Sequence, residues 1–453
     1  MNLLIVGAGK IGHAITAQLS KEGHDLTLID KRPEVLEAVQ STYDINSIAG
    51  NGASLAILKE AGVKDVDVLI AVSNADEINM LACITAATLN PSIQCIARIR
   101  DPEYAAQAYQ MANMFHLALV INPEKQAAAE IASLIKMPGT LHRDTFAKAR
   151  IEIVELRVEE GSRLDGKKLS DLEKLVHSKV LVCAVERGGK TIMPDGAFVL
   201  KAGDKFSVTA YPEQLHNMLA SLGIVRKDIH HVLIAGGGRI SFYLAEQLDK
   251  MHITTTLIEK DRERCELLAD KLPHSRIVHG DASSQAFLDE EDLEDYDALV
   301  SMTGFDEMNI VISMYGALRK VPLTITKVSR GENIPLLNDL PIGPVVCPKD
   351  LVTMHIVRYI RAMEKSGESS VVSVHKIAEG AEALEFVVDE HTRYAGKMLK
   401  DIPVKKNILV VSIRHGVKVS IADGSSVFMP GDTVVVIASQ DEVIRTMNDI
   451  FAE

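Results

Sequence analysis

The chain has 453 residues, a length that allows three or four domains, each with a hydrophobic core of its own. Hydrophobic residues make up 47% and charged residues 25%, as in an ordinary globular protein, and no uninterrupted apolar stretch reaches the ~18 residues of a membrane span. The formal net charge is −13, without a lysine- or arginine-rich run, which argues against binding to nucleic acid or to an anionic membrane surface. We therefore expect no nucleic-acid partner and no direct membrane insertion.

The first elements are a strand, a glycine turn, a helix and a second strand. Residues 3–6 are apolar, the turn reads GAGKIG, a segment of helical period follows, and the next apolar run ends in Asp30. Gly7 allows a sharp turn, Gly9 lets a pyrophosphate approach the helix N-terminus, and Gly12 allows the helix to pack closely on the sheet. Asp30 follows at close to the ~20-residue separation of the acid that binds an adenosine ribose. This order predicts a dinucleotide site.

The rest of the first unit alternates between short apolar strands and amphipathic helices. We predict strands at residues 45–48, 68–72, 94–99 and 117–121, and helices at residues 55–61, 76–89, from 101 and at 123–136. This alternation predicts a parallel, doubly wound sheet. From residue 151 to about 224, alternating strands and turn signals predict a small antiparallel α+β domain that ends in a helix.

The second half of the chain repeats the first. Residues 232–259 repeat the opening motif, with Gly236 in the place of Gly7 and Glu259 in the place of Asp30. A polar linker at residues 364–370 precedes a second small domain. The predicted fold is therefore α/β, with two doubly wound Rossmann-like domains that are each followed by a small α+β domain. The predicted domain limits are 1–138, 142–225, 229–365 and 370–453.

Polar side chains stand where the strands of the first unit end. Asn51 follows the third strand, and Ser73 and Asn74 close the fourth. Carboxyl ends of parallel strands face the ligand crevice, so these side chains are candidates for contacts to a ribose or base, with a simple polar loop as the alternative. Asp76 and Asn79 open the next helix, where such side chains commonly cap the first turn.

Arg98 and Arg100 alternate with apolar residues at the end of the fifth strand. An arginine there can pair with phosphate oxygens, because its guanidinium is planar and always charged. The alternative is salt bridging to acids such as Asp101 or Asp76.

The second copy departs from the first at three of these positions. Ser241 replaces the third glycine, and Lys327 and Ser329 replace the two arginines, so phosphate contacts should be weaker there. Asp30 and Glu259 would both repel a 2′-phosphate, which favours NAD(H) over NADP(H), while the adjacent Lys31, Arg32 and Lys260 leave NADP(H) as the alternative.

Motifs of common catalytic sites are missing from the sequence. There is no G-x-S-x-G, no Walker G-x-x-x-x-G-K-[ST] and no H-E-x-x-H, and the histidines are dispersed. The five cysteines are scattered and never spaced as C-x-x-C, which predicts buried free thiols in a reducing cytoplasm. We expect a nucleotide sensor without catalytic or metal-binding residues; the alternative is an NAD-dependent oxidoreductase with an unidentified substrate.

Motifs over the whole chain carry a family resemblance. The chain contains tandem units with the motifs GAGKIG, LID, GNGAS, VSNADEINM and ARIR, followed by G-K-x-L and P-G-D turns. This combination resembles the cytosolic regulatory subunits of bacterial Trk potassium-uptake systems, the TrkA family, whose modules are RCK (KTN) domains. The resemblance implies a non-catalytic, homotetrameric gating ring, peripheral on the cytoplasmic face of the inner membrane. Its partner would be a membrane potassium-translocating subunit, although a different cation channel or antiporter is an alternative. NAD(H), and in the first copy ATP or ADP, would control it.

The resemblance also implies which residues contact the nucleotide. In the first copy these are Gly7, Ala8, Gly9, Lys10, Ile11, Asp30, Asn51, Ser73, Asn74 and Arg98, with Arg100 added from the strand pattern. In the second copy they are Gly236, Gly237, Gly238, Arg239, Ile240 and Glu259.

Overall fold

The computed structural model describes residues 1–110, 112, 114, 116–146, 151–223, 229–331, 334–337, 340, 342–363, 371–378, 380–439, 444 and 446–452. The predicted linker at 364–370 and the predicted domain limits at 225, 365, 370 and 453 lie outside these residues. The chain divides into two compact units, residues 1–127 with 347–357 and residues 128–346 with 358–453. Each is described by itself below.

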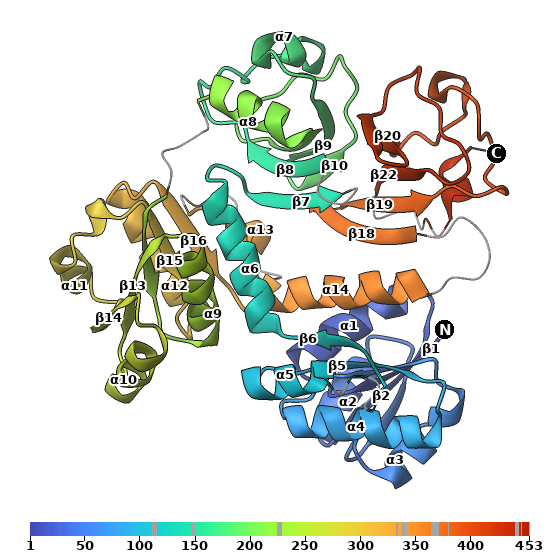
Figure 1. Cartoon of the computed structure of the whole chain (residues 1–453), viewed down its shortest axis with the longest axis vertical. Helices are drawn as coiled ribbons and strands as arrows, with labels where there is room; N and C mark the ends of the chain where they lie inside the picture. Colours follow the sequence, from blue (N-terminus) through green and yellow to red (C-terminus); the bar gives the residue numbers. More distant parts are fainter. Residues whose placement is uncertain are drawn as a thin grey trace. The chain divides into compact units, whose positions relative to one another are not determined.

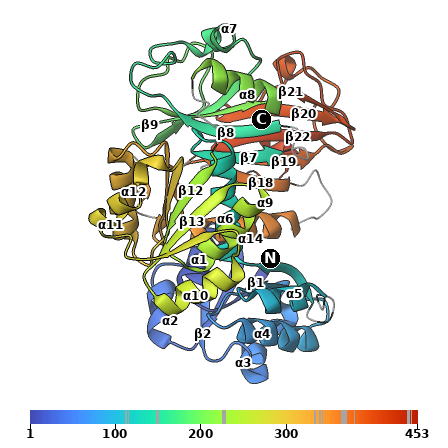
Figure 2. The same cartoon turned by 60° about the vertical axis from the view of Figure 1, so that its left-hand side comes forward.

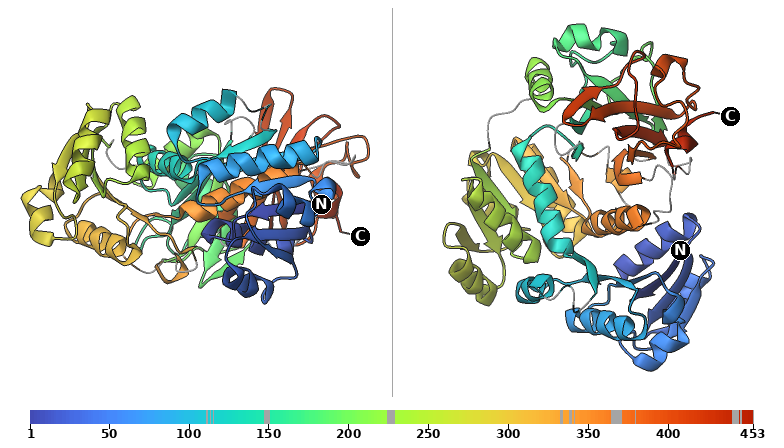
Figure 3. Two further views of the ribbon diagram at one scale, coloured as in Figure 1. Left: turned by 90° about the horizontal axis from the view of Figure 1, so that it is seen from below. Right: turned by 45° about the vertical axis from the view of Figure 1, so that its right-hand side comes forward.

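The first unit contains a parallel sheet in the order β3-β2-β1-β4-β5-β6. This order is that of a Rossmann fold, whose ligand crevice opens at the carboxyl ends of β1 and β4, where the strand order reverses. Figure 3 shows this sheet and its helices, in blue, in two further orientations. The elements are β1 (Asn2–Val6), α1 (Lys10–Lys21), β2 (Asp25–Asp30), α2 (Pro33–Gln40), β3 (Asn46–Ala49), α3 (Leu55–Glu60), η1 (Val63–Asp65), β4 (Val68–Ala71), α4 (Asp76–Leu89), β5 (Gln94–Arg98), α5 (Pro102–Gln110) and β6 (Leu117–Ile121). Helix α6 (Pro123–Lys136) follows, and its residues from 128 belong to the second unit.

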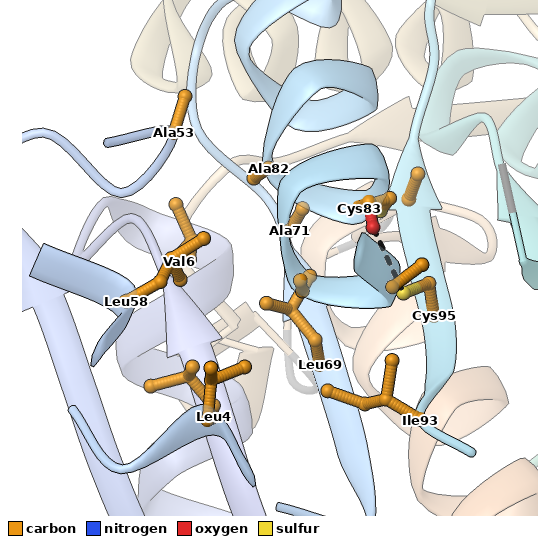
Figure 4. Packing of buried hydrophobic residues seen from close by; sticks show 14 of the residues in the cluster. Leu4, Val6, Ala53, Leu58, Leu69, Ala71, Ala82, Cys83, Ile93 and Cys95 are labelled. Atoms are coloured by element: carbon orange, nitrogen blue, oxygen red, sulfur yellow. Dashed lines mark hydrogen bonds between the residues drawn. The ribbon is translucent and has the colours of Figure 1, made fainter. Parts of the chain in front are cut away.

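The strands of the first sheet form its core because they are apolar on both faces. Leu4 and Val6 of β1 pack with Leu69 of β4 and with residues of α4, and Figure 4 shows them together. The limits that were predicted for strands and helices of this domain agree with the observed ones to within one residue, but α2 and η1 were not predicted.

The second parallel sheet has the order β14-β13-β12-β15-β16-β17, the same arrangement of strands as the first. Figure 2 shows β12 and β13 with helices on both sides. Its elements are β12 (His231–Ala235), α9 (Arg239–Lys250), β13 (Thr254–Glu259), α10 (Arg262–Lys271), β14 (Arg276–His279), α11 (Gln285–Glu290), η3 (Leu293–Asp295), β15 (Ala298–Ser301), α12 (Asp306–Leu318), β16 (Leu323–Lys327), α13 (Ile334–Leu337) and β17 (Val345–Val346). Helix α14 (Pro348–Met363) follows, and its residues up to 357 belong to the first unit.

Two small antiparallel sheets follow the parallel ones, in the orders β10-β9-β11-β8-β7 and β18-β19-β22-β20-β21. The predicted fold class, a tandem pair of Rossmann-like and α+β domains, is confirmed. The first contains β7 (His142–Phe146), β8 (Ile151–Arg157), η2 (Leu169–Asp171), α7 (Leu172–Val176), β9 (Leu181–Arg187), β10 (Lys190–Ile192), β11 (Lys205–Ala210) and α8 (Pro212–Ser221). The second contains β18 (Val371–Ala378), β19 (Ala381–Val387), η5 (Leu399–Asp401), β20 (Ile408–His415), β21 (Lys418–Ile421), β22 (Thr433–Ser439) and η6 (Met447–Ile450).

The two small sheets share one apolar cluster within the second unit. Phe146, Ile153 and Cys183 of the first sheet pack with residues of the second, among them Val435 and Ile437. Figure 1 shows the two sheets beside each other, in green and red. The five cysteines are buried free thiols, as predicted. Within the residues described, none of the helices has the length and apolar character that crossing a membrane requires.

Candidate functional site

The glycines of the first turn meet two different needs. Gly7 has a φ of +104°, and a Cβ there would lie 2.8 Å from the Ser73 nitrogen; a Cβ on Gly12 would lie 1.8 Å from the Gly7 oxygen. The protein itself therefore requires both of these glycines. A Cβ on Gly9, by contrast, would meet nothing within 4 Å, although Gly9 is the N-cap of α1. The open space at this helix N-terminus fits the pyrophosphate of a dinucleotide.

Asp30 ends β2 and faces the glycine turn. Its Oδ2 accepts a hydrogen bond from the Ala8 N–H at 2.8 Å, and its Oδ1 accepts from the Arg32 N–H and from Arg32 Nε, each at 3.0 Å. Burial raises the pKa of Asp30, but the hydrogen bonds from Arg32 and Ala8 outweigh it and hold that pKa below its ordinary value of 3.8. The carboxylate is therefore charged at neutral pH, as an acceptor for ribose hydroxyls must be.

The ends of β4 and β5 are joined by polar side chains. The buried Arg98 directs Nη2 to the Ser73 carbonyl oxygen and, at 3.3 Å, to Asn74 Oδ1. Asn79, in the first turn of α4, bonds to the Ser73 backbone and donates to the Arg98 carbonyl oxygen at 2.8 Å. Ser73, Asn74 and Arg98 thus gather at the carboxyl edge of the sheet.

Arg100 lies outside this group. Its Nε donates to Glu124 Oε1 at 2.7 Å, and its Nη2 lies 2.6 Å from the same oxygen, so its ion-pair partner is an acid that the sequence analysis did not name. Asp76 instead accepts the backbone N–H groups of Arg100 and Asp101, at 2.7 and 2.8 Å.

The prediction that Asp76 and Asn79 cap α4 is wrong. The N-cap residue of α4 is Ala75, which makes no side-chain cap bond. Both polar side chains lie inside the first turn, three residues apart on one helix face, and they bond to the strand ends instead.

Asn51 lies at the exposed end of the loop that follows β3. Its Oδ1 accepts the Ala53 N–H at 3.3 Å and its carbonyl oxygen accepts the Ser54 N–H at 2.8 Å. The Nδ2 group has no hydrogen bond recorded in the described part of the chain, so Asn51 retains a donor for a ligand.

The second glycine turn reproduces the first despite its serine. Gly236 has a φ of +105°, and a Cβ on Gly238 would again meet nothing within 4 Å. Ser241 is fully buried and its hydroxyl donates to the Gly236 carbonyl oxygen. The Gly236 carbonyl oxygen is the counterpart of the Gly7 oxygen that an added Cβ would strike in the first copy, and in the second copy the serine hydroxyl bonds to it.

Glu259 repeats the position of Asp30. Its Oε2 accepts the Gly237 N–H at 2.7 Å and its Oε1 accepts the Asp261 N–H at 2.8 Å. Beside it, Lys260 Nζ lies 2.7 Å from Oδ2 of Asp281, the residue that stands in the place of Asn51. The side-chain hydrogen bond from Lys260 is the main cause that lowers the pKa of Asp281 to about 2. The ribose edge of this cleft therefore carries one more acid than the first.

The cation at the β16 end is held differently from Arg98. Lys327 Nζ lies 3.0 Å from Ser329 Oγ and 3.8 Å from Asp306 Oδ1. Asp306 also accepts the Ser329 N–H at 2.7 Å, as Asp76 accepts that of Arg100. This local ion pair agrees with the expectation of weaker phosphate contacts in the second copy.

Family models match both halves of the chain. The TrkA-N domain model matches residues 3–123 and 232–348, and the TrkA-C domain model matches residues 153–223 and 383–450. The chain is 32% identical to the Trk system potassium uptake protein TrkA homolog of Archaeoglobus fulgidus over 453 residues, which covers 100% of both chains. The chain belongs to the TrkA family. It is also 30% identical to the Trk system potassium uptake protein TrkA of Haemophilus influenzae over 455 residues, 100% of this chain and 98% of that one.

Solved structures share the fold of this TrkA-family chain. The GsuK RCK domain aligns with a TM-score of 0.62 at 16% identity, over 97% of this chain and 92% of that one. The GsuK channel bound to NAD aligns with a TM-score of 0.62 at 16% identity, over 97% and 77%. At these identities the likeness shows the tandem RCK fold and nothing further.

In this TrkA-family chain, most of the predicted residues lie at the carboxyl ends of the strands in the two parallel sheets. Lys10, Ile11, Arg239 and Ile240 lie in the first turns of α1 and α9, directly after the open glycine positions. Sequence reasoning missed the role of Asn79. The signal was present, because asparagine recurs at position 309 of the second copy with the same spacing from the strand. In the described residues, no His, Cys, Asp and Glu side chains gather in threes as a metal site.

Proposed function

We propose that this chain is the regulatory subunit of a potassium transporter and that NAD(H) controls it. It would act as a homotetrameric gating ring, peripheral on the cytoplasmic face of the membrane, and its partner would be the potassium-translocating membrane subunit of a Trk-type system. The proposal excludes a catalytic role for either Rossmann-like domain.

One observation carries the proposal. In both copies, a carboxylate at the end of the second strand bonds to the glycine turn, and the middle glycine leaves open space at a helix N-terminus. This arrangement suits a ribose and a pyrophosphate. Relatives over the full chain length are Trk system potassium uptake proteins, and the GsuK channel, which shares the fold, has been solved bound to NAD.

The two clefts should differ in ligand preference. Asp30 and Glu259 are acids, so both clefts should disfavour a 2′-phosphate and prefer NAD(H) to NADP(H). The guanidinium of Arg98 is suited to phosphate oxygens, so the first cleft is the candidate for ATP or ADP. GsuK, which shares the fold, has been solved bound to ADP. Lys327 lies beside Asp306, which lowers the expected affinity of the second cleft for a terminal phosphate.

Regulation requires differential affinity. The nucleotide must bind one conformation of the ring better than the other, because a ligand with equal affinity for both shifts nothing. The residues of this chain would bind and orient the nucleotide, and the ring would transmit the difference to the membrane subunit.

Potassium flux tests the proposal. The purified chain is added to vesicles that contain the potassium-translocating subunit of a Trk-type system, and uptake is followed with and without NADH. Flux should depend on the chain and respond to NADH, and Asp30→Ala together with Glu259→Ala should abolish the response. Asp25→Ala, at the exposed start of the same strand as Asp30, removes the same charge and should leave the response intact. Flux that ignores the chain would refute the proposal.

The oxidoreductase alternative predicts a different result. An enzyme would consume NADH in the presence of its substrate, whereas a sensor binds it and releases it unchanged. Oxidation of NADH against a panel of carbonyl compounds therefore separates the two functions.

A further inference from the structure

Asn79 connects two neighbouring strand ends from a fully buried position. Its Oδ1 accepts the Ser73 N–H at 2.8 Å, and its Nδ2 donates to the carbonyl oxygens of Ser73 at 3.2 Å and Arg98 at 2.8 Å. Each polar atom of the amide is therefore used, and all its partners are backbone atoms at the ends of β4 and β5. One side chain thus fixes the spacing of the two strands where the crevice opens.

The second copy keeps this arrangement although its neighbours change. Asn309 Oδ1 accepts the Thr303 N–H and also the Thr303 hydroxyl, each at 2.7 Å, and Nδ2 donates to the carbonyl oxygens of Thr303 at 3.3 Å and Lys327 at 2.9 Å. Serine has become threonine and arginine has become lysine, while the backbone contacts are unchanged. The asparagine therefore serves the geometry of the strand ends and not one particular side chain.

The position of these strands relates Asn79 to one half of the ligand. In the order β3-β2-β1-β4-β5, the adenosine ribose would lie at Asp30 on β2 and the first phosphate at the turn after β1. The ends of β4 and β5 would then face the part of the dinucleotide that follows the first phosphate.

Arg98 and Asn79 share an acceptor at this end of the crevice. The Ser73 carbonyl oxygen accepts from Arg98 Nη2 and from Asn79 Nδ2. Asn79 Nδ2 also donates to the carbonyl oxygen of Arg98 itself. Asn79 therefore positions both the backbone of Arg98 and the carbonyl oxygen that accepts a hydrogen bond from its guanidinium. In the second copy, Lys327 lies beside Ser329 and Asp306 instead.

We propose that Asn79 is a positioning residue for nucleotide recognition: it sets the place of the Arg98 guanidinium, and through it the affinity for the part of the ligand beyond the first phosphate. This inference rests on the proposed nucleotide-binding function and names a residue that determines its selectivity. Asn309 does the same structural work without an arginine to direct, which makes it a matched control.

The test compares AMP with NADH. AMP reaches only the β2 and β1 half of the cleft, whereas NADH extends to β4 and β5. Titrations use the full chain carrying Glu259→Ala, so that the first cleft dominates. Asn79→Asp, which places a carboxylate against two carbonyl oxygens, should weaken NADH at least about tenfold while AMP stays within about threefold. Asn309→Asp, the same replacement in the second cleft, controls for the general cost of a buried carboxylate and should leave both affinities of the first cleft unchanged.

Three outcomes would overturn the inference. An equal loss for AMP and NADH would mean that Asn79 only supports the fold, and an equal effect of Asn309→Asp would show that the loss is not local to the first cleft. If the parent protein binds neither ligand, the proposed function itself fails, and this result is distinct from a selective change in a protein that binds.

A second measurement serves if melting shows that Asn79→Asp does not fold. Asn79→Ala and Arg98→Ala are then combined in a double-mutant cycle for NADH affinity. Because Asn79 acts through Arg98, the double variant should lose little more than Arg98→Ala alone. Additive losses would refute the inference.

Discussion

Replacement of Asp30 by alanine tests the first cleft most directly. The carboxylate accepts bonds from the Ala8 N–H at 2.8 Å and from Arg32 at 3.0 Å, and it lies where an adenosine ribose would be bound. A hydrogen bond to a charged group contributes about 1.5–3 kcal/mol. Because about 1.4 kcal/mol corresponds to tenfold in affinity, the dissociation constant for NADH should rise by about ten- to about a hundredfold.

The assay is fluorescence of bound NADH in the full chain carrying Glu259→Ala, which leaves the first cleft to be measured. Asp25→Ala provides the control for loss of one negative charge from the same strand, and melting provides the control for folding. Asp30→Ala should still fold, with a lowered melting temperature because the Ala8 N–H loses its acceptor, and its affinity for NADH should fall while that of Asp25→Ala does not. An unchanged dissociation constant in a folded Asp30→Ala protein would show that the first cleft is not the binding site.

Other perturbations separate stability from binding. Gly9→Ala should weaken NADH binding and lower the melting temperature only slightly, since its Cβ meets only open space and alanine is a poorer N-cap than glycine. Gly12→Ala should cost about 1–3 kcal/mol in the free energy of unfolding, because its Cβ would lie 1.8 Å from a carbonyl oxygen; equal melting of the two variants would contradict this. Phe451→Ala should destabilise the second small domain by about 3–5 kcal/mol, because its ring is 2% exposed within that core, and calorimetry would measure the loss. The pKa of Asp281 is about 2, against an ordinary value of 3.8, so its ion pair with Lys260 stabilises the fold above about pH 4 and this stabilisation is lost as the pH falls through about 2. In Lys260→Met, NMR titration should find the pKa of Asp281 returned toward 3.8. An unchanged pKa would refute the pairing.

The fold followed from the sequence because the decisive signals were local. Short apolar runs separated by helical segments specify a parallel sheet, and the recurrence of the glycine turn with Gly236 and Glu259 specifies the duplication. The acid at Asp30 was found by its spacing alone. These features depend on neighbours in the sequence, so no tertiary information was needed.

Contacts between distant elements could not be predicted in the same way. The ion pair of Arg100 with Glu124 joins the end of β5 to the start of α6. Sequence spacing does not distinguish Glu124 from the many other acids that could pair with Arg100. Asn79 was assigned to a helix cap because capping is the usual role of asparagine in a first turn. Its true partners belong to two strand ends, and only the folded sheet brings them within reach.

A titration with NADH tests the central claim, that this chain senses a nucleotide without consuming it. Bound-cofactor fluorescence and total NADH absorbance are followed in the same sample, in the presence of carbonyl compounds, for the parent protein and for the variant with both Asp30→Ala and Glu259→Ala. The absence of tryptophan keeps the fluorescence background low. We predict saturable binding that the double variant loses, with no NADH oxidised. Steady oxidation by the parent protein would contradict the account and indicate an enzyme.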